Sequence, residues 1–240
     1  MFDFLATRRH QAEMLDEPDA DQGDLIKSLR YIRVINRLLG YDRLVVNHLK
    51  QFSAGWKAGQ VIRVLDVGTG SADIPRRILK WGTQHGWDIR VVAIDLHERI
   101  ALEAQRAAKG ERQLSIVRAD ALRLPFEDNA FDYATTSMFL HHLTETKVEQ
   151  VLREMDRVSR RGIIASDLLR LRRSYAFIRL ATLLANPMVR HDARVSIEQA
   201  FTQAEVIAMR DRAGVSYAAY HNHMTHRFVL SGEKRPANFQ

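Results

Sequence analysis

The chain has 240 residues, 46% apolar and 27% charged, enough for one α/β domain with an appendage and a packed core. It contains no cysteine, which excludes disulfides, thiolate zinc sites, iron–sulfur clusters and cysteine nucleophiles, and which fits a cytoplasmic protein. The formal charge of +7 suits nucleic acid, an anionic membrane surface or an acidic substrate as partner, or reflects a general surplus of arginine.

The N-terminal region predicts a helical appendage over residues 1–57. Its first two dozen residues are acidic and polar, so we expect them to be loose, and they lack the apolar core of a signal peptide. No stretch reaches the roughly 18 consecutive apolar residues of a transmembrane helix. A first amphipathic helix, capped by Asp24 and ended by Gly40, is predicted from the spacing of Leu25, Leu29, Ile32, Ile35 and Leu39. A second helix is expected over 42–52.

Strands and helices alternate from Val61 onward. The hydrophobic patterns predict strands at 61–67, 88–95, 113–120, 131–137 and 161–169, and helices at 73–84, 97–109 and 144–159. Such alternation indicates parallel βαβ units. The fold class is therefore α/β, with a doubly wound, mostly parallel sheet.

The last part of the chain predicts a lid and a hairpin. A helix is expected over 169–185, a loop over 186–196, and a helix that starts at a capping box of Thr202 and Glu205 and stops at Gly214. Two strands, 215–223 and 225–232, then form an antiparallel C-terminal hairpin and bring the sheet to seven strands. Residues 58–240 thus form the main domain, with a helical lid insertion near 169–200.

A glycine turn, LDVGTGSAD at residues 65–73, joins the first strand to its helix. Glycine lets a ligand approach the backbone closely. The dinucleotide pattern G-x-G-x-x-G fails, because Asp73 stands at the third glycine and would repel a pyrophosphate, and no P-loop lysine follows. We therefore expect a ligand other than a phosphate at this turn.

Carboxylates follow the first three strands of the predicted sheet. Asp66 precedes the glycines, Asp95 ends the second strand and Asp120 ends the third. Open parallel sheets bind ligands at the carboxyl ends of their strands. A carboxylate there can accept from a ribose diol, which suits Asp95, or from an exocyclic amine, which suits Asp120.

Four segments together, LDVGTGSAD, AIDLH, RADALRLPF and FDYATTSMFLHHL, resemble the class I S-adenosylmethionine-dependent methyltransferases. The chain is similar to their small-molecule branch, which includes ubiquinone-pathway C-methyltransferases, over about residues 61–164. One position departs from the D-x-G-x-G-x-G pattern, where Ala72 replaces the third glycine. The resemblance implies a Rossmann-like methyltransferase fold, with S-adenosylmethionine as the cofactor and S-adenosylhomocysteine as its product.

The resemblance also implies roles for single residues. Asp66 is expected to steady the turn and reach the methionine ammonium through water, and Asp95 to bind the ribose hydroxyls. The methionine part is expected to lie against Gly68, Thr69 and Gly70 of the turn and against Ser137 at the end of the fourth strand. Adenine is expected to contact Leu96, Asp120 and Ala121.

Three histidines are candidates for a base on the acceptor side, which is needed if the acceptor must lose a proton. His141 and His142 follow the fourth strand, and His191 lies in the expected lid region. A packing role is an equal alternative for the first two. A further group, His221, His223 and His226, is expected to be exposed on a strand rather than to hold a metal.

The basic amphipathic helix near 169–185 can be a lid over an apolar acceptor or a peripheral membrane contact. As a lid, with Tyr31, Ile35, Phe177 and Met188, it suits a small aromatic, polyketide-like or lipid-like molecule methylated at oxygen or carbon. Arg33 or Arg194 could serve an anionic one. Two alternatives remain open: an RNA methyltransferase, and a cofactor-binding partner without catalysis. DNA is not expected, since the proline-rich motif of base-modifying enzymes is missing after the fourth strand.

Overall fold

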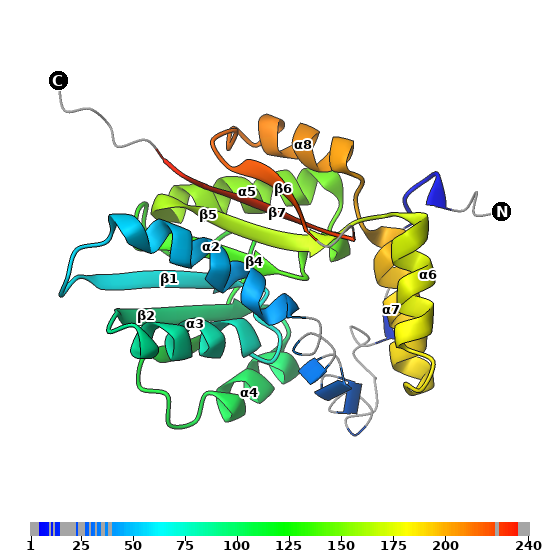
Figure 1. Ribbon diagram of the computed structural model, residues 1–240, viewed down its shortest axis with the longest axis horizontal. Helices are drawn as coiled ribbons and strands as arrows, with labels where there is room; N and C mark the ends of the chain where they lie inside the picture. Colours follow the sequence, from blue (N-terminus) through cyan, green and yellow to red (C-terminus); the bar gives the residue numbers. More distant parts are fainter. Residues whose placement is uncertain are drawn as a thin grey trace.

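The computed structural model shows one central sheet with helices on both faces (Figure 1). The described residues between 23 and 37 are helical. The apolar positions that predict this first helix, and the Asp24 cap, lie outside the described residues. The residues that the structure describes are 5–9, 11, 13, 14, 23, 27, 28, 30, 31, 33, 34, 37, 40–223 and 226–234.

Seven strands within the described residues form the sheet, in the order β3-β2-β1-β4-β5-β7-β6. Neighbouring strands are parallel except at β7, which lies antiparallel between β5 and β6. The predicted α/β, mostly parallel seven-stranded sheet with an antiparallel C-terminal hairpin is confirmed. The strands are β1 (Val61–Val67), β2 (Asp88–Asp95), β3 (Leu114–Arg118), β4 (Phe131–Ser137), β5 (Ser159–Leu168), β6 (Ala219–His223) and β7 (Arg227–Glu233).

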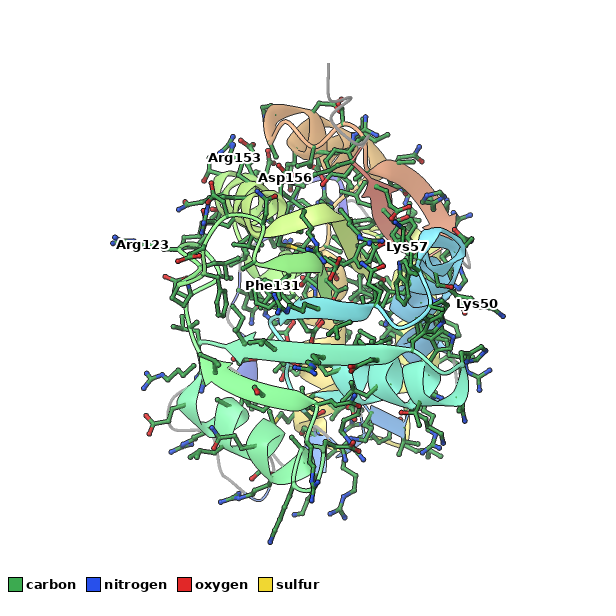
Figure 2. The ribbon with its side chains drawn as sticks, turned by 90° about the vertical axis from the view of Figure 1, so that its left-hand side faces the viewer. Lys50, Lys57, Arg123, Phe131, Arg153 and Asp156 are labelled. Carbon is green, nitrogen blue, oxygen red and sulfur yellow. The ribbon has the colours of Figure 1, made fainter. Side chains whose placement is uncertain are left out.

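Helices cover the two faces of the sheet with separate apolar clusters. The cluster on one face includes side chains of α2 (Leu44–Phe52), α3 (Asp73–Gln84) and α4 (Glu98–Ala107). The other cluster includes α5 (Glu145–Val158) and α8 (Gln203–Arg212). Figure 2, which views the sheet end-on, places Arg153 of α5 on one side of it and Lys50 of α2 on the other. Within the described part of the chain, every helix is too short or too polar to cross a bilayer.

The local signals read from the sequence explain most element boundaries. On α5, the apolar residues at three- and four-residue spacing are all buried; they are Val148, Val151, Leu152, Met155 and Val158. The capping box is present at α8, where the Thr202 hydroxyl accepts from the backbone N–H of Glu205 and the Glu205 carboxylate accepts from that of Thr202. Such paired caps satisfy backbone donors that the helix itself leaves unpaired.

The prediction of a loop over 186–196 is wrong, because these residues belong to α7 (Pro187–Gln199). Asn186 caps this helix by accepting from the backbone N–H of Val189 at 2.8 Å, and Pro187 takes the first helical position, where its missing N–H costs nothing. The apolar period is hidden because the buried face of α7 includes the polar residues Asp192 and Ser196. The preceding helix, α6 (Arg172–Ala181), is shorter than the predicted 169–185.

β5 and β7 approach each other closely at Gly162. A Cβ atom at this position would lie 2.0 Å from the carbonyl oxygen of Gly232, which belongs to the rigid ladder between the two strands. No side chain fits there without separating the strands, so the hairpin docks only against a glycine.

We predict that Gly162→Ala lowers the free energy of unfolding by at least about 1–3 kcal/mol, the usual range for overpacking. Gly55→Ala is the matched control, because a Cβ at Gly55 meets nothing within 4 Å, and its effect should stay below about 0.5 kcal/mol. Urea unfolding of both variants measures the difference. Equal stabilities would contradict the close approach of β5 and β7.

Candidate functional site

A cavity of about 1150 Å³ opens at the carboxyl ends of β1, β2, β3 and β4. Ligand pockets commonly enclose roughly 300–1,000 Å³, so this one has room for two molecules side by side. One end is built by the turns after the strands, and the wall opposite them by α6 and α7. These two helices stand beyond the ends of the strands in Figure 1 and contribute Ile178, Thr182, Val189 and Ser196.

The glycine turn forms the floor of the cavity with its backbone. Gly68 has a φ of +67°, and a Cβ there would lie 2.5 Å from the ring of Phe139, so only glycine fits beneath that ring. Ala72, which replaces the usual third glycine, also adopts the left-handed region with a φ of 56°. This conformation costs an alanine about 1 kcal/mol, which explains why glycine is the commoner residue there.

Asp66 lies below the turn rather than in the cavity wall. Its side chain is buried, and Oδ1 accepts a hydrogen bond of 2.8 Å from the Thr135 hydroxyl on the neighbouring strand β4. Burial raises the pKa of Asp66 to about 6, the hydrogen bond from Thr135 lowers it in part, and the charge of Asp95 raises it further. The carboxyl group thus supports the turn from behind.

Asp95 and Asp120 lie in the cavity wall where the sequence places them. The two oxygens of Asp95 accept from the backbone N–H groups of Gly70, at 3.1 Å, and His97, at 3.0 Å, which fixes the carboxylate. Asp120 accepts from the N–H of Leu122 at 2.9 Å. A carboxylate offers about four acceptor sites, so both groups can also accept from hydroxyls or amines of a ligand.

The other expected cofactor-binding residues also line the cavity, among them Gly68, Thr69, Gly70, Leu96, Ala121 and Ser137. Leu96 is 61% exposed, which leaves an apolar surface for a flat ring to cover. Asp73, the residue that argues against a phosphate, lies in the same wall, where it accepts from the Ser71 hydroxyl at 2.6 Å and pairs with Arg33 at 2.9 Å. The residues present therefore suit a cationic adenosyl ligand.

His141 is held as a cation between two buried carboxylates. Its Nδ1 donates to Asp167 at 2.7 Å, and its Nε2 lies 3.6 Å from Glu13. Burial lowers the pKa of His141, but the charges and hydrogen bonds of Asp167 and Glu13 outweigh burial and raise it to about 10. The expectation that His141 acts as a base does not fit this environment, because the ring is already protonated at neutral pH.

The other two candidate bases lie in different places. His142 is partly exposed and lines the cavity beside Ser137. His191 is not among the lining residues, and its ring contacts Asp192 at 3.1 Å and Gln11 at 3.3 Å. The geometry thus places His141 and His142 in the cavity wall and His191 outside it.

The N-terminal segment, expected to be loose, contributes to the site through Arg8 and Glu13. Arg8 donates to the carbonyl oxygens of His141 and Leu143, at 2.8 and 2.6 Å, while Glu13 accepts from the Ser196 hydroxyl of α7. Neither residue has a local signal in the sequence, because its partners lie more than 100 positions away. A buried Glu beside a paired His is recognisable only once the chain is folded.

Glu13, His141 and His142 bring their ligand atoms within 4.8 Å of one another, a set that could hold a metal ion. We assign it to an ion-pair network instead, because His141 already shares its two ring nitrogens between Asp167 and Glu13. The strand histidines are separate from this group. His221 packs on the ring of His48, and His226 contacts the hydroxyl of Tyr41.

Comparison with known proteins decides the class of this site. Residues 64–162 match the family described as "Methyltransferase domain". This stretch of the chain is similar to a methyltransferase domain. The matched residues run from β1 into β5 and include the glycine turn and all three strand-end aspartates. The resemblance to class I enzymes is confirmed, and S-adenosylmethionine is the cofactor of this class.

The most similar curated relatives include two quinone-pathway enzymes. A ubiquinone/menaquinone biosynthesis C-methyltransferase of Roseobacter denitrificans is 37% identical over 109 residues, 44% of this chain and 40% of the relative. A demethylmenaquinone methyltransferase of a Roseiflexus species is 32% identical over 149 residues, 57% of this chain and 58% of the relative. The chain spans roughly half the length of the curated relatives it matches.

Solved structures share the fold at low sequence identity. A methyltransferase from Aquifex aeolicus has a TM-score of 0.57 at 22% identity, over 77% of this chain and 86% of the other. The magnesium protoporphyrin IX methyltransferase of Synechocystis has a TM-score of 0.57 at 14% identity, over 92% and 91%. The methyltransferase fold therefore extends beyond the matched residues 64–162.

We predict that Asp66→Asn changes how stability depends on pH. The pKa of Asp66 is about 6 in the native state and 3.8 in the unfolded state. The unfolded state therefore loses the Asp66 proton first as the pH rises between these values, and the wild type becomes less stable. The free energy of unfolding of the variant minus that of the wild type should rise by roughly 2–2.5 kcal/mol from pH 4 to pH 7. Urea unfolding across this range measures it, and a constant difference would contradict the raised pKa.

Proposed function

We propose that this protein transfers the methyl group of S-adenosylmethionine to oxygen or carbon of a small aromatic or lipid-like acceptor. The observation that carries the proposal is the cavity that joins Asp95 and Asp120, at the ends of β2 and β3, to His142 and to side chains of α6 and α7. Bound S-adenosylmethionine would supply a methyl group attached to a sulfonium sulfur, and that sulfur is a good leaving group because it becomes a neutral thioether. The residues of the chain then have to bind and orient the cofactor and the acceptor, and to take a proton from the acceptor.

At the cofactor end of the cavity, each part of S-adenosylmethionine can be assigned to particular lining residues. We propose that Asp95 binds the ribose hydroxyls, and that Leu96, Asp120 and Ala121 contact adenine. The backbone of Gly68, Thr69 and Gly70, with Ser137, would face the methionine part. Because Asp66 is buried behind the turn, its effect on the ligand would act through the position of the turn and not by direct contact.

Catalysis in this site would rest mainly on positioning and on exclusion of water, because the leaving group needs no activation. We propose that His142 accepts the proton that the acceptor loses as its oxygen or carbon attacks the methyl carbon. The electron pair of the broken carbon–sulfur bond stays on sulfur. The ring of His142 lies beside that of His141, with ring centroids 4.2 Å apart, and both side chains line the cavity.

The acceptor end favours an apolar molecule. The lid side of the cavity includes Ile178 and Val189, and the lining also contains Leu168 at the end of β5, Met138 from the turn after β4 and Tyr31 from the N-terminal region. This supports the proposed lid near 169–200 and the appendage of residues 1–57 as parts of the acceptor site. The curated relatives named for quinone pathways make a quinone-like ring the first acceptor to test.

Two other functions stay as alternatives. The formal charge of +7 keeps an RNA substrate in consideration, and a salt-dependent shift of the protein with RNA would favour it. A binding-only partner protein is the second. Labelled S-adenosylmethionine, offered with a panel of hydroquinones and phenols, separates the cases, since binding without methylation of any of them would favour the partner role.

We predict that Asp95→Ala lowers the affinity for S-adenosylhomocysteine by roughly ten- to a hundredfold, through loss of charge-assisted hydrogen bonds. Asp88→Ala is the matched control, because Asp88 begins the same strand at the opposite edge of the sheet, where it accepts from Gln113. Isothermal titration calorimetry measures both affinities. If Asp95→Ala binds as tightly as the control, the ribose contact is wrong.

We predict that His142→Gln lowers kcat by roughly 10²- to 10⁴-fold, the usual contribution of a general base, with unchanged affinity for S-adenosylhomocysteine. His85→Gln, an exposed histidine after α3, should keep the full rate. His191→Gln tests the rival candidate. Loss of activity in His191→Gln and not in His142→Gln would overturn the assignment of the base.

A further inference from the structure

The lid carries an exposed apolar cluster on the side that does not face the cavity. Ile178 and Thr182 line the cavity, whereas Leu180, Leu183 and Leu184 are 70%, 60% and 98% exposed. Together with Phe177 they make up four of the eight strongly exposed large apolar side chains among the described residues. Their concentration in eight consecutive residues is unusual for a surface that faces only water.

Positively charged residues flank this cluster in the sequence. Residues 168–191 contain five arginines and no aspartate or glutamate. Arg170 is buried against Glu205, at 2.7 Å, but the other four are exposed; they are Arg172, Arg173, Arg179 and Arg190. Exposed leucines on helices that also carry exposed arginines match the two layers of an anionic lipid surface, whose acyl region takes up apolar side chains and whose headgroups attract cations.

We propose that the end of α6 and the turn to α7, residues 177–184, dock this protein on an anionic lipid bilayer. Leu180, Leu183 and Leu184 enter the acyl boundary, and the four exposed arginines contact the headgroups. A second copy of the chain is a poorer occupant. A symmetric dimer through this surface would bring the arginines of the two copies together, and like charges oppose such a contact.

The docking surface and the cavity share the same helices, so docking would place the apolar acceptor wall next to the lipid. The Tyr31 hydroxyl donates to the carbonyl oxygen of Ala181 at 2.9 Å, which ties the end of α6 to the N-terminal region. A lipid-dissolved acceptor could then enter between α6 and this region without crossing water. This last step rests on the proposed function, whereas docking itself does not.

The test is flotation of the full chain with phosphatidylcholine vesicles, with and without phosphatidylglycerol. The wild type should bind the anionic vesicles, and high salt should weaken the binding. The double variant Leu183→Asp/Leu184→Asp should lower the vesicle partition coefficient by at least roughly tenfold, because each leucine loses its burial in lipid. The control, Leu102→Asp, changes a leucine on α4 that is 45% exposed and should bind like the wild type.

A second variant, Arg172→Gln/Arg179→Gln, should lower binding to the anionic vesicles and flatten its dependence on salt. The proposal is overturned if the wild type ignores anionic vesicles or if the Leu102 control loses as much binding as the leucine pair. It is equally overturned if light scattering shows a dimer that Leu183→Asp/Leu184→Asp dissociates. Vesicle binding needs neither cofactor nor acceptor, so its failure is distinct from a failure to bind S-adenosylhomocysteine.

Discussion

The buried network around His141 holds together parts of the chain that are far apart in sequence. Asp167, the penultimate residue of β5, accepts from both the backbone N–H and the ring of His141, which follows β4. Glu13 reaches the same ring from the N-terminal region and accepts from Ser196 of α7. Removing one charge from such a buried set leaves the other charges uncompensated. The N-terminal region, the segment after β4 and α7 therefore depend on each other.

This arrangement explains how an acceptor site can be built beside a cofactor site that follows general rules. The cofactor side needs only parallel strands that end at one edge, a turn without side chains and carboxylates at the strand ends. The acceptor side needs α7 and the N-terminal segment to arrive at the same place. Arg8 supports both, because it donates to the carbonyl oxygens of His141 and of Gln199, the last residue of α7.

The lid illustrates a helix pair that serves two environments. The inner faces of α6 and α7 line the cavity, while the turn between them exposes leucines and the two helices carry exposed arginines. An inner face that contains Asp192 and Ser196 weakens the apolar period, which is why the sequence alone predicts a loop where α7 lies. The cap of Asn186 followed by Pro187 is the local signal that identifies this helix.

Short-range patterns in the sequence are enough to predict the alternating elements, the C-terminal hairpin, the glycine turn and the aspartates at the ends of the first three strands. These features depend on periods and turn residues within short windows, and the edge where they meet follows from parallel topology. The folded structure alone reveals that Asp66 lies behind the turn, that His141 sits between two carboxylates, and that Glu13 and Arg8 belong to the site. These facts depend on burial and on contacts between residues 26 to 191 positions apart, which no local pattern predicts.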